Sequence, residues 1–517
     1  MARDSSSWHA LAAFAQRHLF ASLLALRLAN VLLVQTYIHP DETWQSLEVA
    51  HRAVFGYGFV TWEWQHALRG FAHPMLFAAV YATLRVLGLD DTFLILAAPY
   101  VLVALIAATT DYATYHFAKR VAGSQVANWA VLCSAVSWSM GSGVVRPLVN
   151  SAETALTAAA FVYWPWDQAI TSSLPVALVF AALSCVIRPT SAALWLCADR
   201  LGYKRWVFPP YQFYLFNVHE GLATWFGESP PLYHLYVSMP ILFTSMLPFV
   251  LHGAYLAFAR GKTAVGPAVV AVAAMFVFSM VPHMEYRFLY PLLPIGFMYA
   301  AVSINSLVGA RSGNLEKRPP KNSGNAGARI KGRRLWSTRS IVAYLLVTNV
   351  PASLYLNLVH QRGVIDAMAY LRAEAQSGHV EDIGFLMPCH STPYYSHLHQ
   401  PVPMWFLSCE PPLEKSALAT HYWEANDFEL DPVGFMHRIF DDGKGKASDV
   451  VNLRYGPGET RRKPSHLVLY ECMAKRIHQE LVALGYGECA SFFNSHFNGD
   501  ARRKGDVVVY CRPPTTA

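Results

Sequence analysis

The stretch HPDETWQSLE at residues 39–48, continued by TWEW at 61–64 and LRG at 68–70, decides how the rest of the chain is interpreted. It follows the first long apolar stretch, at about residues 19–38, and carries four carboxylates and three tryptophans. Acidic side chains at a membrane exit are costly unless they are solvated or used in function. Tryptophans favour the membrane–water boundary. The stretch is therefore either a solvated loop with an aromatic belt or a place where chemistry occurs.

The composition is that of a membrane protein. Of 517 residues, 54% are hydrophobic and only 15% are charged, whereas soluble domains are about 25% charged. The formal net charge is +7, but the basic residues cluster in short loops between apolar stretches. That distribution argues against nucleic-acid binding.

Charge also determines the predicted topology. We expect the apolar stretch at 71–88 to be a re-entrant or interfacial helix, because a full crossing there would place Lys119 and Arg120 outside, and basic residues favour the cytoplasmic side. With a cytoplasmic N-terminus, nine crossings are then predicted, at about 19–38, 93–117, 125–142, 153–165, 173–197, 236–258, 264–282, 288–308 and 339–358. The basic loop 309–338 falls in the cytoplasm, and the other polar motifs gather on the opposite face.

The predicted fold is an all-α multi-span membrane domain, 1–358, followed by a small α/β domain, 359–517, on the side opposite the basic loop. Short strands are expected at 383–387, 466–470 and 506–510, and a helix at 472–484. Five cysteines lie in this tail without a Cys-x-x-Cys pair, so a zinc site is not expected. One or two disulfides are expected, with the pairing left open.

Three further motifs carry polar residues at the ends of apolar stretches. Arg146 and Glu153 flank Asn150, which is equally suited to cap a helix. Arg188 stands within an apolar run, where an arginine is either functional or reaches to the interface.

His283, Glu285 and Arg287 alternate along HMEYRF, and the simplest reading pairs Glu285 with Arg287. In the tail, MPCHSTPYYSHLH at 387–399 contains three histidines and a cysteine, but their spacing fits no standard zinc signature.

Together these motifs resemble the GT-C mannosyltransferases that use dolichyl-phosphate mannose, and the tail at 387–399 resembles the branch that adds the third mannose of GPI anchors. The resemblance implies that Asp41 is the base on the acceptor hydroxyl in an inverting transfer. Glu42 would orient Asp41 or bind the acceptor. The remaining implied roles are donor-phosphate binding by Arg146, Arg188, His283 and Arg287 with support from Glu285, and acceptor binding by Trp44, Glu153 and His390.

The implied activity is α-1,2 transfer of mannose from dolichyl-phosphate mannose to the second mannose of a GPI precursor at the endoplasmic reticulum membrane. The implied partners are the two lipid-linked substrates, with no cofactor, metal, nucleic acid or obligate protein partner. A related enzyme of N-glycan assembly is the nearest alternative, although the tail at 387–399 argues against it. A multi-span transporter would instead place charges along a pathway and show related halves.

The chain departs from the family pattern between about 191 and 235. The resemblance predicts two more spans after IRPT at 187–190, whereas here LWLCA at 194–198 runs directly into DRLGY at 199–203. The expected His-Pro-Trp-containing loop is also altered, to ESPPLY at 228–233. Losing two crossings preserves the topology, and a shortened natural variant and a missing exon both remain open.

Overall fold

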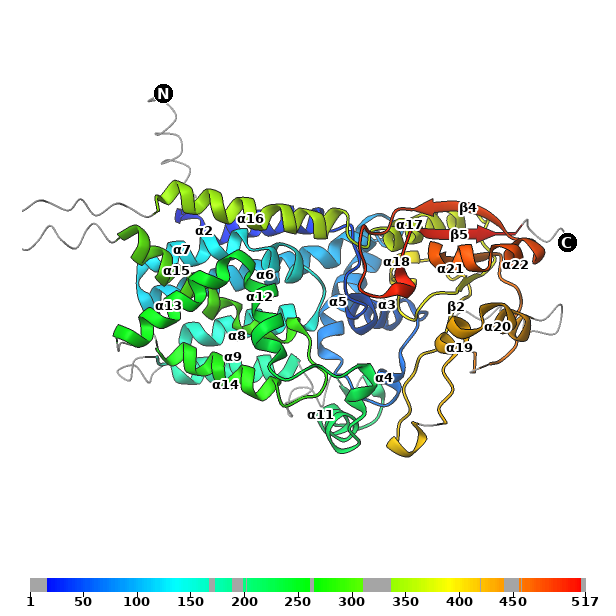
Figure 1. Cartoon of the computed structure of the whole chain (residues 1–517), viewed down its shortest axis with the longest axis horizontal. Coiled ribbons are helices and arrows are strands. Elements are labelled where there is room, and N and C mark those ends of the chain that lie inside the picture. Colours follow the sequence, from blue (N-terminus) through cyan, green and yellow to red (C-terminus); the bar gives the residue numbers. More distant parts are fainter. Residues whose placement is uncertain are drawn as a thin grey trace, which may run out of the picture.

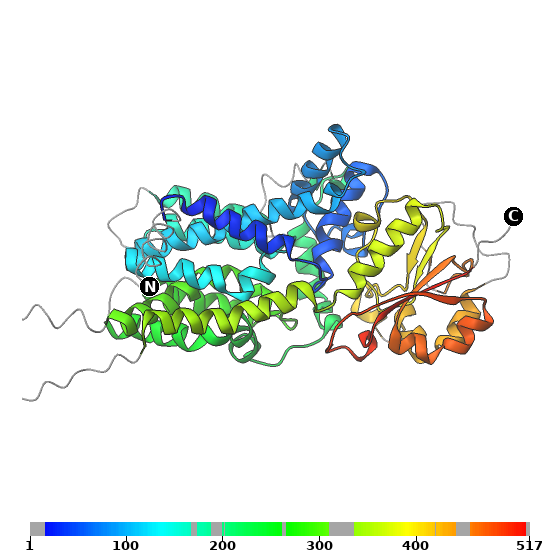
Figure 2. The ribbon, with the colours of Figure 1, turned by 90° about the horizontal axis from the view of Figure 1, so that it is seen from above.

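The computed structural model describes residues 16–166, 173–187, 199–200, 202–260, 265–309, 336–418, 420–440, 455–456 and 458–512. A bundle of long helices occupies one end of the molecule, and a sheet-containing domain occupies the other (Figure 1). The elements of the first loop, α3 (Glu48–Phe55), α4 (Trp62–Gln65) and α5 (Ala72–Val86), lie between these two parts. A second view, from above, shows the same order along the long axis (Figure 2).

The bundle is built around a central apolar helix, α15. Its helices are α2 (Leu19–Leu32), α6 (Leu94–Ala122), α7 (Ser124–Val136), α8 (Val149–Tyr163), α9 (Leu174–Ile187), α13 (Leu247–Arg260), α14 (Val265–Phe278), α15 (Leu293–Gly309) and α16 (Thr338–Leu358). Helix α15 packs against α6, α7 and α13. The contact with α13 is close because Gly253 faces the carbonyl of Tyr299, where a Cβ would overlap it. Small residues at such crossings let membrane helices approach closely.

Each predicted crossing corresponds to a helix, but the helices differ in length. Four described helical runs are long and apolar enough to cross a membrane, namely Leu94–Ala122, His234–Ala259, Tyr286–Val308 and Thr338–Gln376. Three shorter apolar helices are Leu19–Leu32, Leu174–Ser184 and Val265–Phe278. The count of nine crossings therefore stays a prediction. Helix α5, predicted to be re-entrant or interfacial, packs against α3 and α6 at the junction of the two parts.

A fully buried ion pair joins three helices inside the bundle. Arg27 on α2 donates from Nε and Nη2 to the carboxylate of Asp111 on α6, at 2.6 and 2.9 Å. Ser134 on α7 donates to the same carboxylate at 2.5 Å, and its backbone carbonyl accepts from Arg27 at 3.0 Å. Both side chains of the ion pair have no exposed surface. The contacts fix the relative register of α2, α6 and α7.

Replacing only one partner of this pair should be more harmful than replacing both. Asp111→Ala leaves the Arg27 guanidinium buried without a counter-charge, which is expected to lower the free energy of unfolding by about 3–5 kcal/mol. Arg27→Met combined with Asp111→Leu should recover most of that loss. Thermal unfolding in detergent micelles measures both effects. A double variant as unstable as Asp111→Ala would contradict this account.

The C-terminal part begins with α17 (Gly363–Gln376) and contains a five-stranded sheet of order β2-β1-β3-β5-β4. The strands are β1 (Ile383–Phe385), β2 (Met404–Phe406), β3 (His466–Tyr470), β4 (Gly487–Phe492) and β5 (Val507–Cys511). Strand β1 runs parallel to β2 and β3, and β5 runs antiparallel to β3 and β4. Helices α19 (Glu424–Leu430) and α20 (Pro432–Ile439) contribute Phe428 and Phe435 to the core under this sheet.

The sequence predicted three of these strands, β1, β3 and β5, and they are confirmed. It missed β2, which has three residues, and β4, which is largely exposed and carries few apolar side chains. The predicted helix 472–484 is divided into α21 (Glu471–Arg476) and α22 (His478–Ala483). Two disulfides, Cys389–Cys409 and Cys489–Cys511, settle the pairing that the sequence left open.

The first loop and the C-terminal part share one hydrophobic core. Tyr37 and Trp44 belong to the same buried cluster as residues of α17, β1 and β3. Trp44 donates from its indole nitrogen to the carbonyl of Thr392 at 3.1 Å. Glu48 accepts hydrogen bonds from the backbone N–H groups of Ser396 and Tyr395, at 2.8 and 3.2 Å. The carboxylate of Glu48 thus tethers α3 to the start of α18 (Tyr395–Leu398).

Removing the Glu48 carboxylate should loosen this contact in a pH-dependent way. Glu48→Ala leaves buried N–H groups without an acceptor and should lower the free energy of unfolding by about 1–3 kcal/mol per lost partner. Burial raises the pKa of Glu48 from 4.5 to about 7. Because the pKa is higher in the folded than in the unfolded protein, protonation of Glu48 favours the folded state. This stabilisation is complete below about pH 4.5 and is lost as the pH rises through about 7.

The difference in melting temperature between the wild type and Glu48→Ala should therefore shrink between pH 5 and pH 8. The conservative variant Glu48→Asp serves as a control for the loss of the side chain. A difference that grows with pH would show that the ionised carboxylate is the stabilising form.

Candidate active site

Asp41 and Glu42 open a helical run that continues to Phe55. The run begins because the N–H groups of Thr43 and Trp44 bond back to the carbonyl of Pro40. Its first turns form a π-helix, η1 (Thr43–Leu47), a local widening that is frequent at functional sites. The two adjacent carboxylates point to different surroundings, and this gives them different roles.

Asp41 lies in a half-buried cluster of charges with the HMEYRF motif. Arg287 donates from Nη1 to Asp41 Oδ2 at 2.7 Å. The same guanidinium makes two bonds of 2.6 Å to the oxygens of Glu285. His283 Nε2 lies 3.5 Å from Glu285. The structure thus brings together Asp41, His283, Glu285 and Arg287, four of the residues predicted from the sequence, and the simple pairing of Glu285 with Arg287 is present within the larger cluster.

The cluster is open to solvent on one side. The side chains of Asp41, Glu285 and His283 are 25%, 27% and 29% exposed, while that of Arg287 is 9% exposed. A substrate could therefore reach the carboxylate of Asp41 without rearrangement of the core.

Electrostatics set the protonation of the groups around Arg287. Burial alone would raise the pKa of Glu285, but Arg287 and His283 outweigh it and hold that pKa well below its ordinary value. The hydrogen bond to Glu285 raises the pKa of His283. Burial, with a smaller effect of Arg287, lowers the pKa of His39 to about 3. His39 is therefore neutral and holds the hydroxyl of Tyr286 at 2.8 Å.

A second ion pair, which the sequence analysis did not assign to the site, flanks this cluster. Arg69 donates from Nε and Nη2 to Glu63 Oε1 at 3.0 and 2.6 Å. Burial alone would lower the pKa of Arg69, but Glu63 and, to a smaller extent, Asp41 raise it. Arg69 is therefore a second cation near Asp41. Its position within the opening 39–70 stretch was the available signal, although no spacing rule pairs it with Glu63.

Glu42 turns inward and binds Arg146. The guanidinium of Arg146 has no exposed surface and lies 2.9 Å from Glu42 Oε2. Its other donors bind the carbonyls of Thr36 and Ser142 and the hydroxyl of Thr36. Glu42 also accepts from the N–H groups of Ile38 and His39, at 3.0 and 2.7 Å. The predicted role of Arg146 in phosphate binding is corrected, because protein groups occupy its donors and no solvent reaches it. Glu42 is likewise a positioning residue for the loop.

The predicted acceptor residues lie in different places. Trp44 is buried beneath His390, with ring centroids 4.5 Å apart, and faces a cavity of only about 10 Å³. That space holds about one water molecule. In this structure Trp44 anchors the C-terminal part, and its contact with the acceptor stays a prediction. Glu153 is buried on α8, where its backbone carbonyl accepts from Ser184. Arg188 lies outside the described residues.

His390 also lies beside Cys389 and Cys409, with potential ligand atoms within 4.8 Å of one another. The two sulfur atoms are joined in a disulfide. They therefore have no thiolate to offer a metal ion while that bond is intact.

The arrangement of helices resembles that of a protein whose crystal structure is solved. The crystal structure of ArnT from Cupriavidus metallidurans bound to undecaprenyl phosphate has a TM-score of 0.52 to this chain, at 11% identity, and covers 97% of this chain and 98% of that one. At this identity the likeness concerns the fold alone, which is of the GT-C membrane type.

The sequence identifies the family. The pattern of the Alg9-like mannosyltransferase family matches residues 18–198 and 196–399. The chain belongs to this family, and the prediction that it is a membrane glycosyltransferase is confirmed. The two matched segments meet at 196–198, at the start of the stretch where the chain departs from the expected pattern.

Two relatives align over most of their length and name the kind of mannosyltransferase that this chain resembles. GPI mannosyltransferase 3 of Yarrowia lipolytica is 37% identical in an alignment of 530 positions that covers 94% of this chain and 96% of that protein. GPI alpha-1,2-mannosyltransferase 3 of Homo sapiens is 31% identical in an alignment of 532 positions that covers 96% of this chain and 87% of that protein. The resemblance stated from the motifs is thus confirmed over nearly the whole chain.

The two adjacent carboxylates should respond differently to removal of their charge. Glu42→Gln leaves Arg146 buried with less than its full counter-charge and should lower the free energy of unfolding by about 3 kcal/mol. Asp41→Asn, which alters a partly exposed carboxylate, should change it by less than about 1 kcal/mol. Melting temperatures in detergent compare the two directly. Equal losses of stability would mean that Asp41 is also a structural residue.

Proposed function

We propose that the protein transfers mannose in α-1,2 linkage from dolichyl-phosphate mannose to the second mannose of a GPI-anchor precursor at the endoplasmic reticulum membrane. The observation that carries this proposal is the half-exposed cluster of Asp41, Arg287, Glu285 and His283 in a chain of a mannosyltransferase family. Relatives over nearly the full length bear the name of the GPI enzyme, which supports the choice of acceptor.

Asp41 acts as the base. Its carboxylate accepts the proton of the acceptor 2-hydroxyl while the hydroxyl oxygen attacks the anomeric carbon of mannose. The bond between that carbon and the phosphate oxygen breaks, and its electron pair leaves with dolichyl phosphate. A β-linked donor and an α-linked product make the reaction inverting, so one carboxylate suffices and no covalent intermediate forms.

Arg287 and His283 balance the charge that the leaving group gains. In the present arrangement Arg287 is shared by Asp41 and Glu285. When Arg287 donates hydrogen bonds to the donor phosphate instead of to Asp41, the carboxylate of Asp41 becomes free to accept a proton. Glu285 keeps both cations in place, and its bond to His283 favours the charged imidazolium. Arg188 remains a predicted phosphate ligand.

The active site faces the lumen in this proposal. The first loop and the C-terminal part lie at the same end of the helical bundle, whereas α16 begins at the opposite end (Figure 1). That opposite end carries the boundary of the basic loop 309–338, which is expected in the cytoplasm.

The described part of the 191–235 stretch contacts the site. The carbonyl of Gly227 lies 3.2 Å from His283 Nδ1. The side chain of Ser229 receives the N–H of Met284 at 3.0 Å. These contacts hold the HMEYRF motif in position, so the altered loop supports the catalytic cluster of this chain.

Removing the charge of Asp41 should abolish transfer while the fold is kept. Asp41→Asn cannot take the hydroxyl proton and should lower the transfer rate by about 100-fold or more. The measurement uses purified protein in lipid vesicles with labelled dolichyl-phosphate mannose and a dimannosyl GPI precursor. Asp91→Asn is a matched control, because the Asp91 side chain is 94% exposed and lies away from the cluster.

Complementation of cells that lack the third GPI mannosyltransferase gives an independent readout. The wild type should restore surface GPI-anchored proteins, and Asp41→Asn should not. Rescue by Asp41→Asn would refute the role of Asp41. An expressed wild type that transfers no mannose to the GPI precursor in vitro would refute the proposed function.

A further inference from the structure

A cavity of about 290 Å³ lies between the first loop and the C-terminal part. Thr61, Trp62 and Gln65 line it from the first loop, and His390, Trp405 and Tyr422 are among the residues that line it from the other side. Its volume is near the lower limit of about 300 Å³ for small-molecule sites. None of the residues assigned to the transfer reaction lines it, apart from His390.

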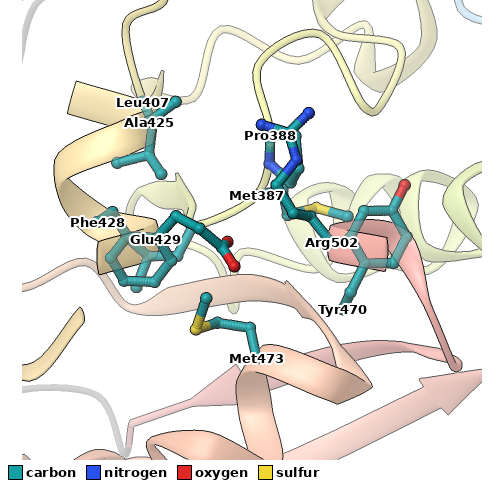
Figure 3. A pocket seen from close by; sticks show the side chains of 10 residues that line it. Met387, Pro388, Leu407, Ala425, Phe428, Glu429, Tyr470, Met473 and Arg502 are labelled. Atoms are coloured by element: carbon teal, nitrogen blue, oxygen red, sulfur yellow. The ribbon is translucent and has the colours of Figure 1, made fainter. Parts of the chain in front are cut away.

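Two cavities of the C-terminal part are too small to hold such a ligand. One, shown in Figure 3, lies among Met387, Phe428, Glu429 and Met473 and measures about 10 Å³. A space of that size holds about one water molecule. Of these three cavities, the one of 290 Å³ has room for a ring-sized ligand.

The lining combines flat aromatic rings, such as those of Trp62 and Trp405, with polar side chains, such as those of Gln65, Ser408 and His421. A sugar fits this lining, because its C–H face packs on an aromatic ring and its hydroxyls both donate and accept.

The cavity adjoins the catalytic cluster through two contacts. The ring of Phe226 stacks nearly parallel to that of Trp62, with centroids 6.4 Å apart, and lies 6.1 Å from the ring of His283. One aromatic side chain therefore separates a cavity wall from the cluster. On the other side, Glu63 belongs to the same short helix as Trp62 and Gln65, and it binds Arg69 near Asp41.

From this geometry we propose that the cavity is a carbohydrate subsite, which holds a sugar of the acceptor glycan beyond the mannose that receives the new residue. The proposal rests on the proposed function for the identity of that glycan. The polar side chains among the aromatic rings of this lining favour a sugar over the lipid chain of either substrate. Trp62, Gln65 and Tyr422 are its specificity-determining residues, and Asp41 remains the base.

The test uses Tyr422→Ala and Gln65→Ala, since both side chains are exposed at the cavity mouth and their loss leaves the core intact. With the dimannosyl GPI precursor, each variant should raise the KM for acceptor about fivefold to tenfold and leave kcat and the KM for dolichyl-phosphate mannose unchanged. Tyr422→Phe keeps the ring and should restore the acceptor KM. Phe493→Ala is the matched control, because Phe493 is exposed on the C-terminal part and does not line the cavity.

A second acceptor separates the subsite from the transfer reaction. Lipid-free methyl α-mannoside supplies the receiving sugar but none of the sugars beyond it, so its KM should be the same for the wild type and Tyr422→Ala. Tryptophan fluorescence of the wild type should respond to the lipid-free GPI glycan, and Tyr422→Ala should weaken that binding about fivefold to tenfold.

The outcomes distinguish this proposal from the proposed function. If the wild type transfers mannose to the precursor but Tyr422→Ala and Gln65→Ala keep its acceptor KM, the subsite is refuted and the function stands. If the wild type binds the glycan through this cavity but transfers no mannose, the function is refuted and the subsite stands.

Discussion

The buried guanidinium of Arg146 is the interaction on which the site depends. It joins the segment that follows α2 at Thr36, the first loop at Glu42 and the turn before α8 at Ser142. A weaker contact of 3.5 Å reaches the carbonyl of Leu356 on α16. A buried charge that lost its partner would be strongly destabilising. The pair therefore holds together segments that are more than 300 residues apart in sequence.

This constraint separates the functions of two neighbouring acids. The carboxylate oxygens of Glu42 accept hydrogen bonds from Arg146 and from the N–H groups of Ile38 and His39. Asp41, the preceding residue of the same helical run, turns outward to Arg287 and to solvent. Catalysis needs a carboxylate that substrate can reach, and precise placement needs one that does not move. Asp41 is the accessible carboxylate and Glu42 is the fixed one, and the two lie next to each other on one helical turn.

The C-terminal part is a structural component of the site and not an appended module. It completes a core with Tyr37 and Trp44, and Glu48 binds the start of α18. It also forms one wall of the 290 Å³ cavity. The shortened stretch near 216–229 fills the remaining side, where Phe216 and Phe226 pack on Trp62. The contacts of Phe216 and Phe226 with Trp62 thus place this described part of the stretch at the edge of the site.

The sequence alone determined the class of fold and three strands of the sheet, which follow from the local signals of apolar length and alternation. The four members of the Asp41 cluster were singled out by their charged motifs together with the resemblance to the mannosyltransferases, and the structure brought them together. Only the tertiary structure decided that Arg146 and Trp44 are buried supports, that Arg69 flanks the cluster, and which cysteines pair. It also revealed the ion pair of Arg27 with Asp111 and the cavity beside Trp62. Each of these depends on which side chains meet across distant segments, and spacing along the chain carries no information about that.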